Sequence, residues 1–422
     1  MTRGMATVMM AVLVGLTNRV FASESQVGES LPLRVTLDQV LQLLNDRSPR
    51  TAAERATVDV VAADRITAGT LPNPTISYGG VHLFAGSSTG AVTSHQFVVD
   101  QPLLLFAQRQ TRRDLAELNV AAEQGRVDAS LAERRFAVRQ AFASLLARQE
   151  ELRILQQSHV ELQRVQEVVH GRASEGDRSE YDVLRIDTEA RTLDIEVRNA
   201  TTEAENASGH LAAIMGFSGW RPQADGSLQP GNTPTDFDVL WDATQRRRPE
   251  LVALQRQETA ARGELVLAHR ERLPVPVVSG GVVTTREVDG TSAYFGASLP
   301  LPLFDRNRGA IARATAEVDA RTRAVNAEVA EARAEVERTR ATFVSKRETL
   351  ATIENDLLDQ VPTLRRMAED AYREGRDGIL ELLDANRSLK EIQLLHLKQL
   401  ETTKLAEEEL LAVAGLNAPP AP

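Results

Sequence analysis

The chain contains no cysteine and few aromatic residues. The lack of cysteine excludes disulfide bonds, thiolate metal ligands, a cysteine nucleophile and a lipidated cysteine within these 422 residues. Tryptophan, tyrosine and phenylalanine make up 4% of the sequence, although 42% of it is hydrophobic. Few large rings among many alanines favour narrow seams between helices over one thick globular core.

Long apolar runs are also missing, because beyond the N-terminal region no stretch approaches the about 18 consecutive apolar residues of a membrane-spanning helix. The N-terminal region carries an early charge at Arg3, an apolar run over residues 6–16, and a small residue, Ala22, before a polar segment. This pattern predicts a cleaved secretory signal peptide over residues 1–22. A retained signal anchor is the alternative, but the apolar run is short for a membrane span.

The charge of the chain is negative, with a formal net value of −10. Loss of Arg3 and Arg19 with the signal peptide would take this value from −10 to −12. An acidic, exported chain has no basic surface excess for nucleic acid, so we expect no nucleic-acid partner.

The second half of the sequence repeats the first at a shift of about 200 positions. LPNPTISYGGV at 71–81 matches LPVPVVSGGVV at 273–283, and QPLLLF at 101–106 matches LPLPLF at 299–304. These matches predict a tandem repeat joined by a linker rich in glycine and proline. The predicted segments are a signal peptide (1–22), a first repeat (23–216), a linker (217–235), a second repeat (236–415) and a disordered tail (416–422).

Each repeat predicts a helical segment, two short strands, a very long helix, a break and another long helix. Apolar residues over 183–214 recur at alternating steps of three and four, as in a coiled coil. In the second repeat a heptad seam runs from Ile311 to Ala371 with one inserted step of four. We therefore expect one helix over 307–373, about 100 Å long at 1.5 Å per residue. Helices of this length pack side by side in rods or tubes.

The four predicted strands have the length of membrane-spanning β-strands, about nine to eleven residues. Their side chains alternate imperfectly, with Phe97 and Val99 set against Gln96. Periodicity alone leaves open a soluble hairpin at the end of a helical rod. Four strands cannot close a membrane barrel, so a barrel would need further copies of the chain, and a trimer would supply twelve strands. The strands are predicted at 74–84, 93–101, 275–285 and 292–301.

The ordered motifs resemble the TolC-like outer-membrane factors over essentially the whole mature sequence. LPNPTISYGG, QPLLLFAQRQTRR and LPLPLFDRNRGAIARATAEVDA are most similar to the CzcC-like branch of heavy-metal efflux channels. The resemblance implies a mainly α fold with membrane β: a tandem-repeat protomer of a trimeric channel, with a 12-stranded barrel in the outer membrane and a coiled-coil tunnel through the periplasm. Many relatives carry a lipidated N-terminal cysteine, so here anchoring would rest on the barrel alone.

The resemblance also implies the partners. They are a periplasmic adaptor, or membrane fusion, protein, an inner-membrane pump of the resistance-nodulation-division type, outer-membrane lipid and two further copies of the chain. The expected function is a passive exit duct for heavy-metal cations, with no enzymatic activity and no cofactor. Two alternatives stay open, which are a TolC-type channel for drugs or type I protein secretion, and a soluble periplasmic coiled-coil adaptor or structural protein.

The segment EGRDGILELLDANRSL at 374–389 carries two acids, Glu381 and Asp384, that share one face of a helix. An acid pair could act as general acid and base, but such chemistry needs a pocket and neighbours that separate the two pKa values. A metal site is also weakly supported, because the seven histidines are scattered without ligand spacing. A solvated helix face is the plain alternative.

The resemblance assigns these acids another role. Residues that match Glu381 and Asp384 line the narrow periplasmic entrance of the tunnel, so three protomers would bring six carboxylates into one ring. Acidic rings favour cations and release them readily. In the first repeat, Asp182 matches a residue that ties neighbouring helices together in the closed state.

Glycines mark the turns between the long helices in both repeats. Gly176 and Gly375 suit a tight turn between antiparallel helices. The resemblance makes these turns the docking surface for the adaptor's helical hairpins. Asp377, preceded by Arg376, stands where the family often has a basic residue that closes the gate, so the closed-state contacts of this chain are expected to differ.

Overall fold

The structure is a computed structural model that describes residues 31–86, 93–174, 179–285, 290–358, 360–374, 376 and 378–417. The predicted signal peptide and the last five residues of the predicted tail lie outside the described residues. The predicted turn residues Gly176, Gly375 and Asp377 also lie outside them.

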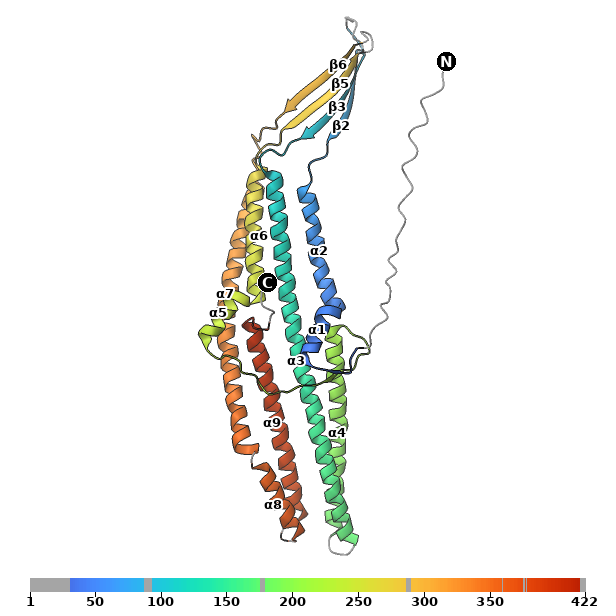
Figure 1. Ribbon diagram of the computed structural model, residues 1–422, viewed down its shortest axis with the longest axis vertical. Coiled ribbons are helices and arrows are strands. Elements are labelled where there is room, and N and C mark those ends of the chain that lie inside the picture. The colour runs from blue at the N-terminus through green and yellow to red at the C-terminus, as the bar shows by residue number, and fades with distance from the viewer. Residues whose placement is uncertain are drawn as a thin grey trace, which may run out of the picture.

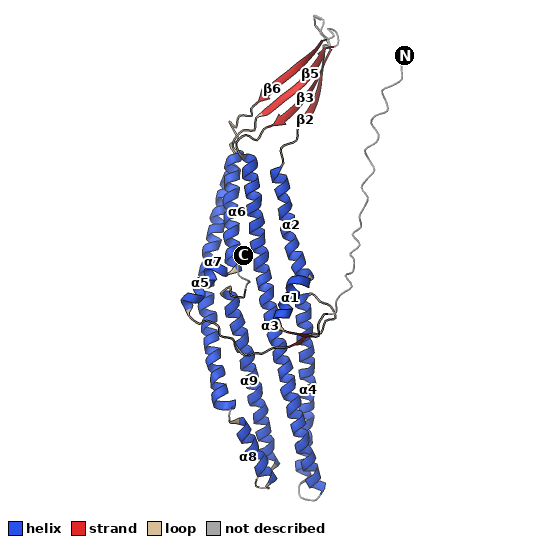
Figure 2. Ribbon diagram, viewed as in Figure 1, coloured by secondary structure: helices blue, strands red, loops and turns tan. Residues whose placement is uncertain are grey.

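Long helices form an elongated column that carries a small β-sheet at one end (Figure 1). Helix accounts for most of the described chain, and the strands gather almost entirely in that sheet (Figure 2). In the first half the elements are β1 (Arg34–Val35), α1 (Leu37–Arg47), α2 (Pro49–Gly69), β2 (Thr75–His82), β3 (Thr93–Pro102), α3 (Gln108–Ser174) and α4 (Glu180–Met215). In the second half they are β4 (Gln223–Ala224), α5 (Phe237–Arg247), α6 (Pro249–Glu271), β5 (Val277–Thr285), β6 (Gly290–Ser298), α7 (Arg308–Thr352), a π-helical turn (Ile353–Leu358), α8 (Val361–Arg373) and α9 (Ile379–Val413).

Matching sequence signals start matching helices in the two halves. Thr36 forms a capping box at the start of α1, and the side chain of Asp236 caps α5. Pro49 and Pro249 occupy the first position of α2 and α6, where a missing N–H costs nothing. Residues of the same kind therefore determine where α1 and α2 begin in the first half and where α5 and α6 begin in the second.

The main sheet is an antiparallel meander in the order β2, β3, β5, β6. Its central pairing joins the two halves of the chain, because β3 pairs with β5 from Ser94 opposite Thr285 to Pro102 opposite Val277. Gly281 allows this close approach, since an added Cβ would lie 2.1 Å from the carbonyl oxygen of Phe97. Within the described chain, the outer edges of β2 and β6 have no strand partner.

The prediction of a single helix over 307–373 is wrong, because the structure divides this segment into several elements. Helix α7 ends at Thr352, a π-helical turn follows, and α8 begins at Val361. Pro362 lacks an N–H and is tolerated only in the first turn of a helix, so an uninterrupted helix through it is disfavoured. The predicted seam fails here as well, since Leu357 and Leu364 are 39% and 55% exposed. By contrast, α3 runs unbroken for 67 residues, or about 100 Å.

The seam predicted over 183–214 is buried or half-buried at every one of its apolar positions. At the end of the column away from the sheet, its residues join a core with α3, α8 and α9 (Figure 1). The buried residues of this core are Leu155, Leu162, Val169, Ile186, Ala190, Leu193, Ala200, Tyr372, Ile379, Leu382 and Leu383. The α3–α4 and α8–α9 hairpins are thus packed together by an apolar seam.

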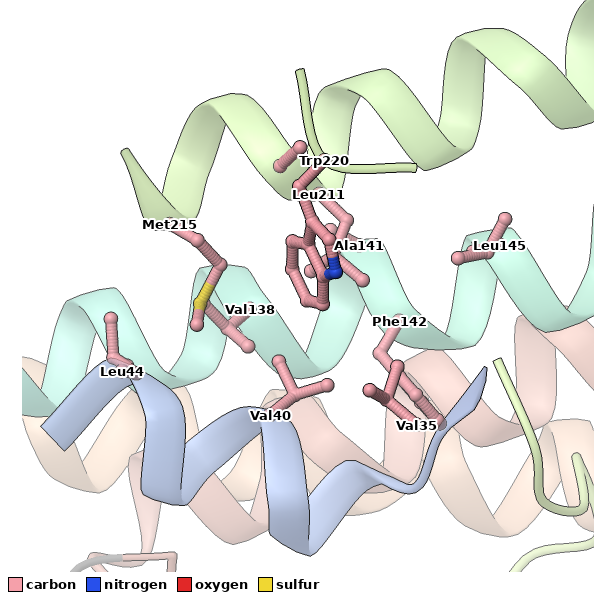
Figure 3. Close-up of a cluster of buried hydrophobic side chains, with 11 residues drawn as sticks. Val35, Val40, Leu44, Val138, Ala141, Phe142, Leu145, Leu211, Met215 and Trp220 are labelled. Carbon is pink, nitrogen blue, oxygen red and sulfur yellow. The ribbon is translucent and has the colours of Figure 1, made fainter. Parts of the chain in front are cut away.

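A second core lies in the middle of the column, where α1, α3, α4 and Trp220 meet (Figure 3). The indole of Trp220 donates a hydrogen bond to the carbonyl of Pro32 at 2.9 Å. Further along the same connecting segment, the backbone N–H of Gly231 and the hydroxyl of Thr233 donate to Glu407 at 2.7 and 2.6 Å. Glu407 is only 1% exposed and also pairs with Lys404. One buried carboxylate of α9 therefore holds the segment that crosses the column (Figure 1).

A search of the described residues finds no helix that is both long enough and apolar enough to cross a membrane.

Candidate functional site

The first two turns of α9 place the two predicted acids at the end of the column away from the sheet (Figure 1). Glu381 folds back toward Gly378, where an added Cβ would lie 3.0 Å from its carboxylate oxygen. A negative charge in the first turn interacts favourably with the helix dipole. Asp384 follows one turn later, and both side chains are exposed. The favourable interaction with the helix dipole thus accounts for an acid at Glu381, but it does not account for an acid at Asp384.

Helices α4 and α9 form a hollow, open to solvent, around these acids. The charged residues that line it are Arg185, Glu189, Glu381, Asp384 and Arg387. In the described part of the chain, neither Glu381 nor Asp384 forms an ion pair. The structure therefore brings both predicted acids into one hollow, with two arginines that were not predicted there.

An ion pair across the hollow joins α9 to α4. The guanidinium of Arg387 lies 2.8 Å from Glu189, and this hydrogen bond, with a smaller contribution from Asp384, raises the pKa of Arg387. One turn further, Lys390 lies 2.7 Å from Glu196. Such partly exposed pairs each contribute about 1 kcal/mol or less, so they fix the register of the two helices more than they stabilise the fold.

Arg185 has a different environment from Arg387. Its guanidinium donates to the hydroxyl of Tyr181 at 3.1 Å, which leaves its charge unneutralised by a carboxylate contact among the described residues. Spacing could have placed Arg387 near the acids, because it follows Asp384 by three residues on the same helix face. The pairing of Arg387 with Glu189 across the hollow, and the presence of Arg185 beside it, could not be read from one helix alone.

The structure places Asp182 in the first turn of α4, where its backbone N–H donates to the Ser179 hydroxyl at 3.3 Å. Asp182 is half-buried and is not among the residues that line the hollow around Glu381 and Asp384. Within one protomer, the three predicted acids therefore do not form one cluster.

A histidine and an acid link α3 to α4 near the same end. The imidazole of His170 lies 2.8 Å from Asp187, and the amide of Gln166 donates to the same carboxylate oxygen at 2.7 Å. These contacts, with His170 the largest, hold the pKa of Asp187 below its ordinary value. A search of the described residues finds no group of three or more histidines and acids that could hold a metal ion.

The sheet at the other end has two chemically different faces. Its register puts residues of alternating position on opposite sides, so that Tyr78 lies beside Phe97, with ring centroids 4.9 Å apart. The apolar side chains of one face are Ile76, Tyr78, Phe97, Val99, Val278, Val282, Ala293, Phe295 and Ala297, and the same face also carries Gly80, His82, Thr93, His95, Gln101, Gly280, Thr284 and Thr291. The polar face carries Thr75, Ser77, Gly79, Ser94, Gln96, Asp100, Ser279, Gly281, Ser292, Gly296 and Ser298, together with Val81, Val98, Val283 and Tyr294.

The apolar face is exposed in the single chain. Ile76 is 76% exposed and Phe295 is 84% exposed. Contiguous exposed apolar surface of this kind marks contact with a membrane or with another protein. Toward the loops, the apolar face ends in polar side chains, which include His82 hydrogen-bonded to Thr93 and His95 hydrogen-bonded to Tyr78.

Comparisons with known proteins agree with this geometry. Residues 240–416 match the outer membrane efflux protein family. The cobalt-zinc-cadmium resistance protein CzcC of Cupriavidus metallidurans is 23% identical over 390 residues, which are 90% of each chain. A solved structure of CusC superposes with a TM-score of 0.71 at 16% identity, covering 90% of this chain and 91% of that one. The Campylobacter jejuni CmeC outer membrane channel superposes with a TM-score of 0.72 at 13% identity, covering 92% and 87%. The fold is therefore that of these solved outer-membrane channels, and the second half of the chain is similar to the outer membrane efflux protein family.

Proposed function

We propose that the chain is the protomer of an outer-membrane channel in a tripartite efflux system and serves as a passive exit duct for heavy-metal cations. The observation that carries the proposal is the sheet with one apolar and one polar face at the end of a long helical column. In a membrane, the apolar face meets lipid and the polar face lines water. The name of CzcC, a cobalt-zinc-cadmium resistance protein, supports the metal cargo.

The sheet edges support assembly as a trimer. Unpaired edge strands present free N–H and C=O groups, which a bilayer cannot satisfy. Pairing β6 of one protomer with β2 of the next satisfies both edges, and three protomers close a barrel of twelve strands from the four that each contributes.

Exposed apolar side chains along the column support the same assembly. Leu184 and Ile195 lie on one face of α4, and Leu364 and Met367 lie on one face of α8. All four are more than half exposed in the single chain. A ring of protomers covers such faces with neighbouring helices, and the long helices then enclose a tunnel that continues the barrel.

The acids of α9 set the selectivity of the proposed tunnel. Three copies of the Glu381 and Asp384 pair form a ring of carboxylates that favours cations. The turns that hold Gly176, Gly375 and Asp377 are proposed to dock the adaptor protein, which connects the channel to a pump in the inner membrane. Asp182 is proposed to tie neighbouring helices in the closed state.

Purification from membranes tests the proposal and its alternatives. We expect a detergent-extracted, heat-modifiable trimer that conducts ions in planar bilayers, and a deletion strain that becomes sensitive to cobalt, zinc or cadmium. A protein extracted without detergent would indicate a soluble rod or adaptor. A conducting trimer whose deletion changes drug tolerance or protein secretion, with metal tolerance unchanged, would assign it to the other channel class.

A further inference from the structure

Arginines gather at the junction of the sheet and the column. Three segments meet there, 103–114, 270–274 and 299–308, and we call them the basic girdle. The girdle contains seven arginines and three acids, in a chain whose formal net charge is −10. Its local excess of positive charge is therefore opposite in sign to the molecule as a whole.

The fold brings these segments to one level. Segment 103–108 links β3 to α3, segment 299–308 links β6 to α7, and α6 ends at Glu271 just before β5. In Figure 1 the strands rise from the ends of these helices at the same height along the column. The girdle therefore lies directly below the sheet, on the helix side.

Apolar side chains separate the sheet from the arginines. The order along both links is strand, apolar link and then arginine. The exposed apolar residues of the two links are Leu105 (63%), Phe106 (41%), Leu301 (65%), Leu303 (63%) and Phe304 (99%). Their exposure leaves a strip of apolar surface between the proposed membrane sheet and the girdle charges.

The two links share an unusual backbone position. In the described part of the chain, Ala107 and Asn307 are the non-glycine residues with positive φ, at 60° and 56°. Each lies between its apolar link and the first turn of the following long helix. The same backbone conformation therefore recurs in both halves where the apolar link meets the helix.

Most of the girdle arginines have no hydrogen-bond or ion-pair partner among the described residues. Arg112 lies 2.9 Å from Glu271, and Arg109 donates to the carbonyl of Gly69 at 2.7 Å. The side chains without a hydrogen bond or ion pair to any described residue are Arg113, Arg270, Arg272, Arg306 and Arg308, and all are exposed. A cation at Arg308, the first residue of α7, opposes the helix dipole, whereas Arg270, in the last turn of α6, is favoured by it, so helix stability does not account for the set as a whole.

We infer that the basic girdle binds the headgroups of anionic phospholipids in the leaflet nearest the column. The guanidinium group forms paired hydrogen bonds with phosphate, and its planar fork suits a headgroup better than a diffuse counterion. Leucine and phenylalanine of the links enter the acyl boundary just above those phosphates. The inference rests on the proposed function, because it requires the sheet to lie in a membrane.

Lipid retention by the purified full-length protein tests the inference. Neutral detergent micelles are mixed with phosphatidylglycerol or phosphatidylcholine, and retained lipids are counted by native mass spectrometry. We expect the wild type to prefer phosphatidylglycerol by about tenfold or more, since each surface arginine strengthens binding to anionic lipid. The triple variant Arg113→Gln, Arg306→Gln, Arg308→Gln should lose most of this preference. High salt should weaken it in the wild type.

Matched variants separate the girdle from net charge. The triple variant Arg191→Gln, Arg198→Gln, Arg323→Gln removes the same charge from exposed positions on α4 and α7 and should keep the preference. Replacing Arg113, Arg306 and Arg308 by lysine keeps the positive charge and should keep most of the preference for phosphatidylglycerol. If the glutamine variant does not fold, the comparison of the lysine variant with the wild type decides the question.

Three results would overturn the inference. They are a wild type that does not distinguish the two lipids, an equal loss in the α4 and α7 variant, and displacement of the lipid by excess inorganic phosphate, which would indicate a small-anion site. Conductance is recorded on the same preparation. A conducting trimer without lipid preference contradicts this inference alone, whereas a protein that neither assembles nor conducts contradicts the proposed function.

Discussion

At the residue scale, the structure divides the charged side chains of the column into those that hold helices together and those that face solvent. Arg387 with Glu189 and Lys390 with Glu196 cross between α9 and α4. Glu381 and Asp384 lie beside the first of these pairs without an ion pair of their own among the described residues. The unpaired acids therefore keep their negative charge available for ions in the proposed tunnel.

The double variant Glu381→Ala, Asp384→Ala should weaken cation preference. Removing both carboxylates from each of three protomers takes away the negative field that attracts cations to the constriction. Reversal potentials across a salt gradient in planar bilayers should shift toward zero, and block by divalent or trivalent cations should weaken. Glu203→Ala, Glu205→Ala, on exposed positions of α4, is the control. Unchanged selectivity in the α9 variant would remove these acids from the proposed constriction.

Asp187 gives a pH dependence with a defined sign. Its folded-state pKa lies below the ordinary value, mainly because of His170. The stabilisation it provides is present above the ordinary pKa of aspartate, about 3.9, and is lost as pH falls through the lowered folded value. Asp187→Asn should therefore increase amide exchange at the α3–α4 end at neutral pH, with a difference from wild type that shrinks below about pH 4. A difference that grows as pH falls would contradict this assignment.

Strain at Ala107 is testable by a small change. A non-glycine residue at φ 60° is disfavoured, and glycine adopts this conformation freely. Ala107→Gly should leave stability unchanged or raise it by up to about 1 kcal/mol, measured by chemical unfolding in micelles. The control Ala320→Gly, at an exposed position inside α7, should lower stability by about 1 kcal/mol. Equal losses in both variants would show that Ala107 is not strained.

At the element scale, buried charge fixes the connecting segment to the column. Glu407 accepts hydrogen bonds from Gly231 and Thr233 and pairs with Lys404. Burial is the largest single influence and lowers the pKa of Lys404, but the carboxylates of Glu407 and Glu408 together raise it above its ordinary value. A buried carboxylate with this many donors positions the segment between α4 and α5.

Glu407→Gln should loosen that segment. The neutral amide loses the charge-assisted contacts and leaves Lys404 without this partner, at a cost of about 1–3 kcal/mol. Hydrogen exchange at the Gly231 amide should rise clearly, while exchange within β3 and β5 stays unchanged. Glu409→Gln, at a partly exposed neighbour paired with Arg338, is the control and should have little effect. Protection of Gly231 that survives Glu407→Gln would assign the segment's order to other contacts.

At the scale of the whole molecule, the sequence predicts much of the architecture because its local patterns are strong. Strands predicted at 74–84 and 275–285 are found at Thr75–His82 and Val277–Thr285, since alternation and flanking prolines mark them. The break before α8 was missed because the heptad pattern continues through Pro362. Contacts such as Arg387 with Glu189 join residues 198 positions apart, and no local pattern encodes them.

The central claim is that the sheet crosses a membrane with its apolar face to lipid and its polar face to water. The cysteine-free chain allows a direct test with single cysteines at neighbouring positions of β2 and β3. In reconstituted channels, Ser77→Cys and Gln96→Cys, on the polar face, should react with a membrane-impermeant thiol reagent and lower the conductance. Ile76→Cys and Phe97→Cys, on the apolar face, should stay unreactive. Equal reaction at both faces, with no change in conductance, would contradict the account.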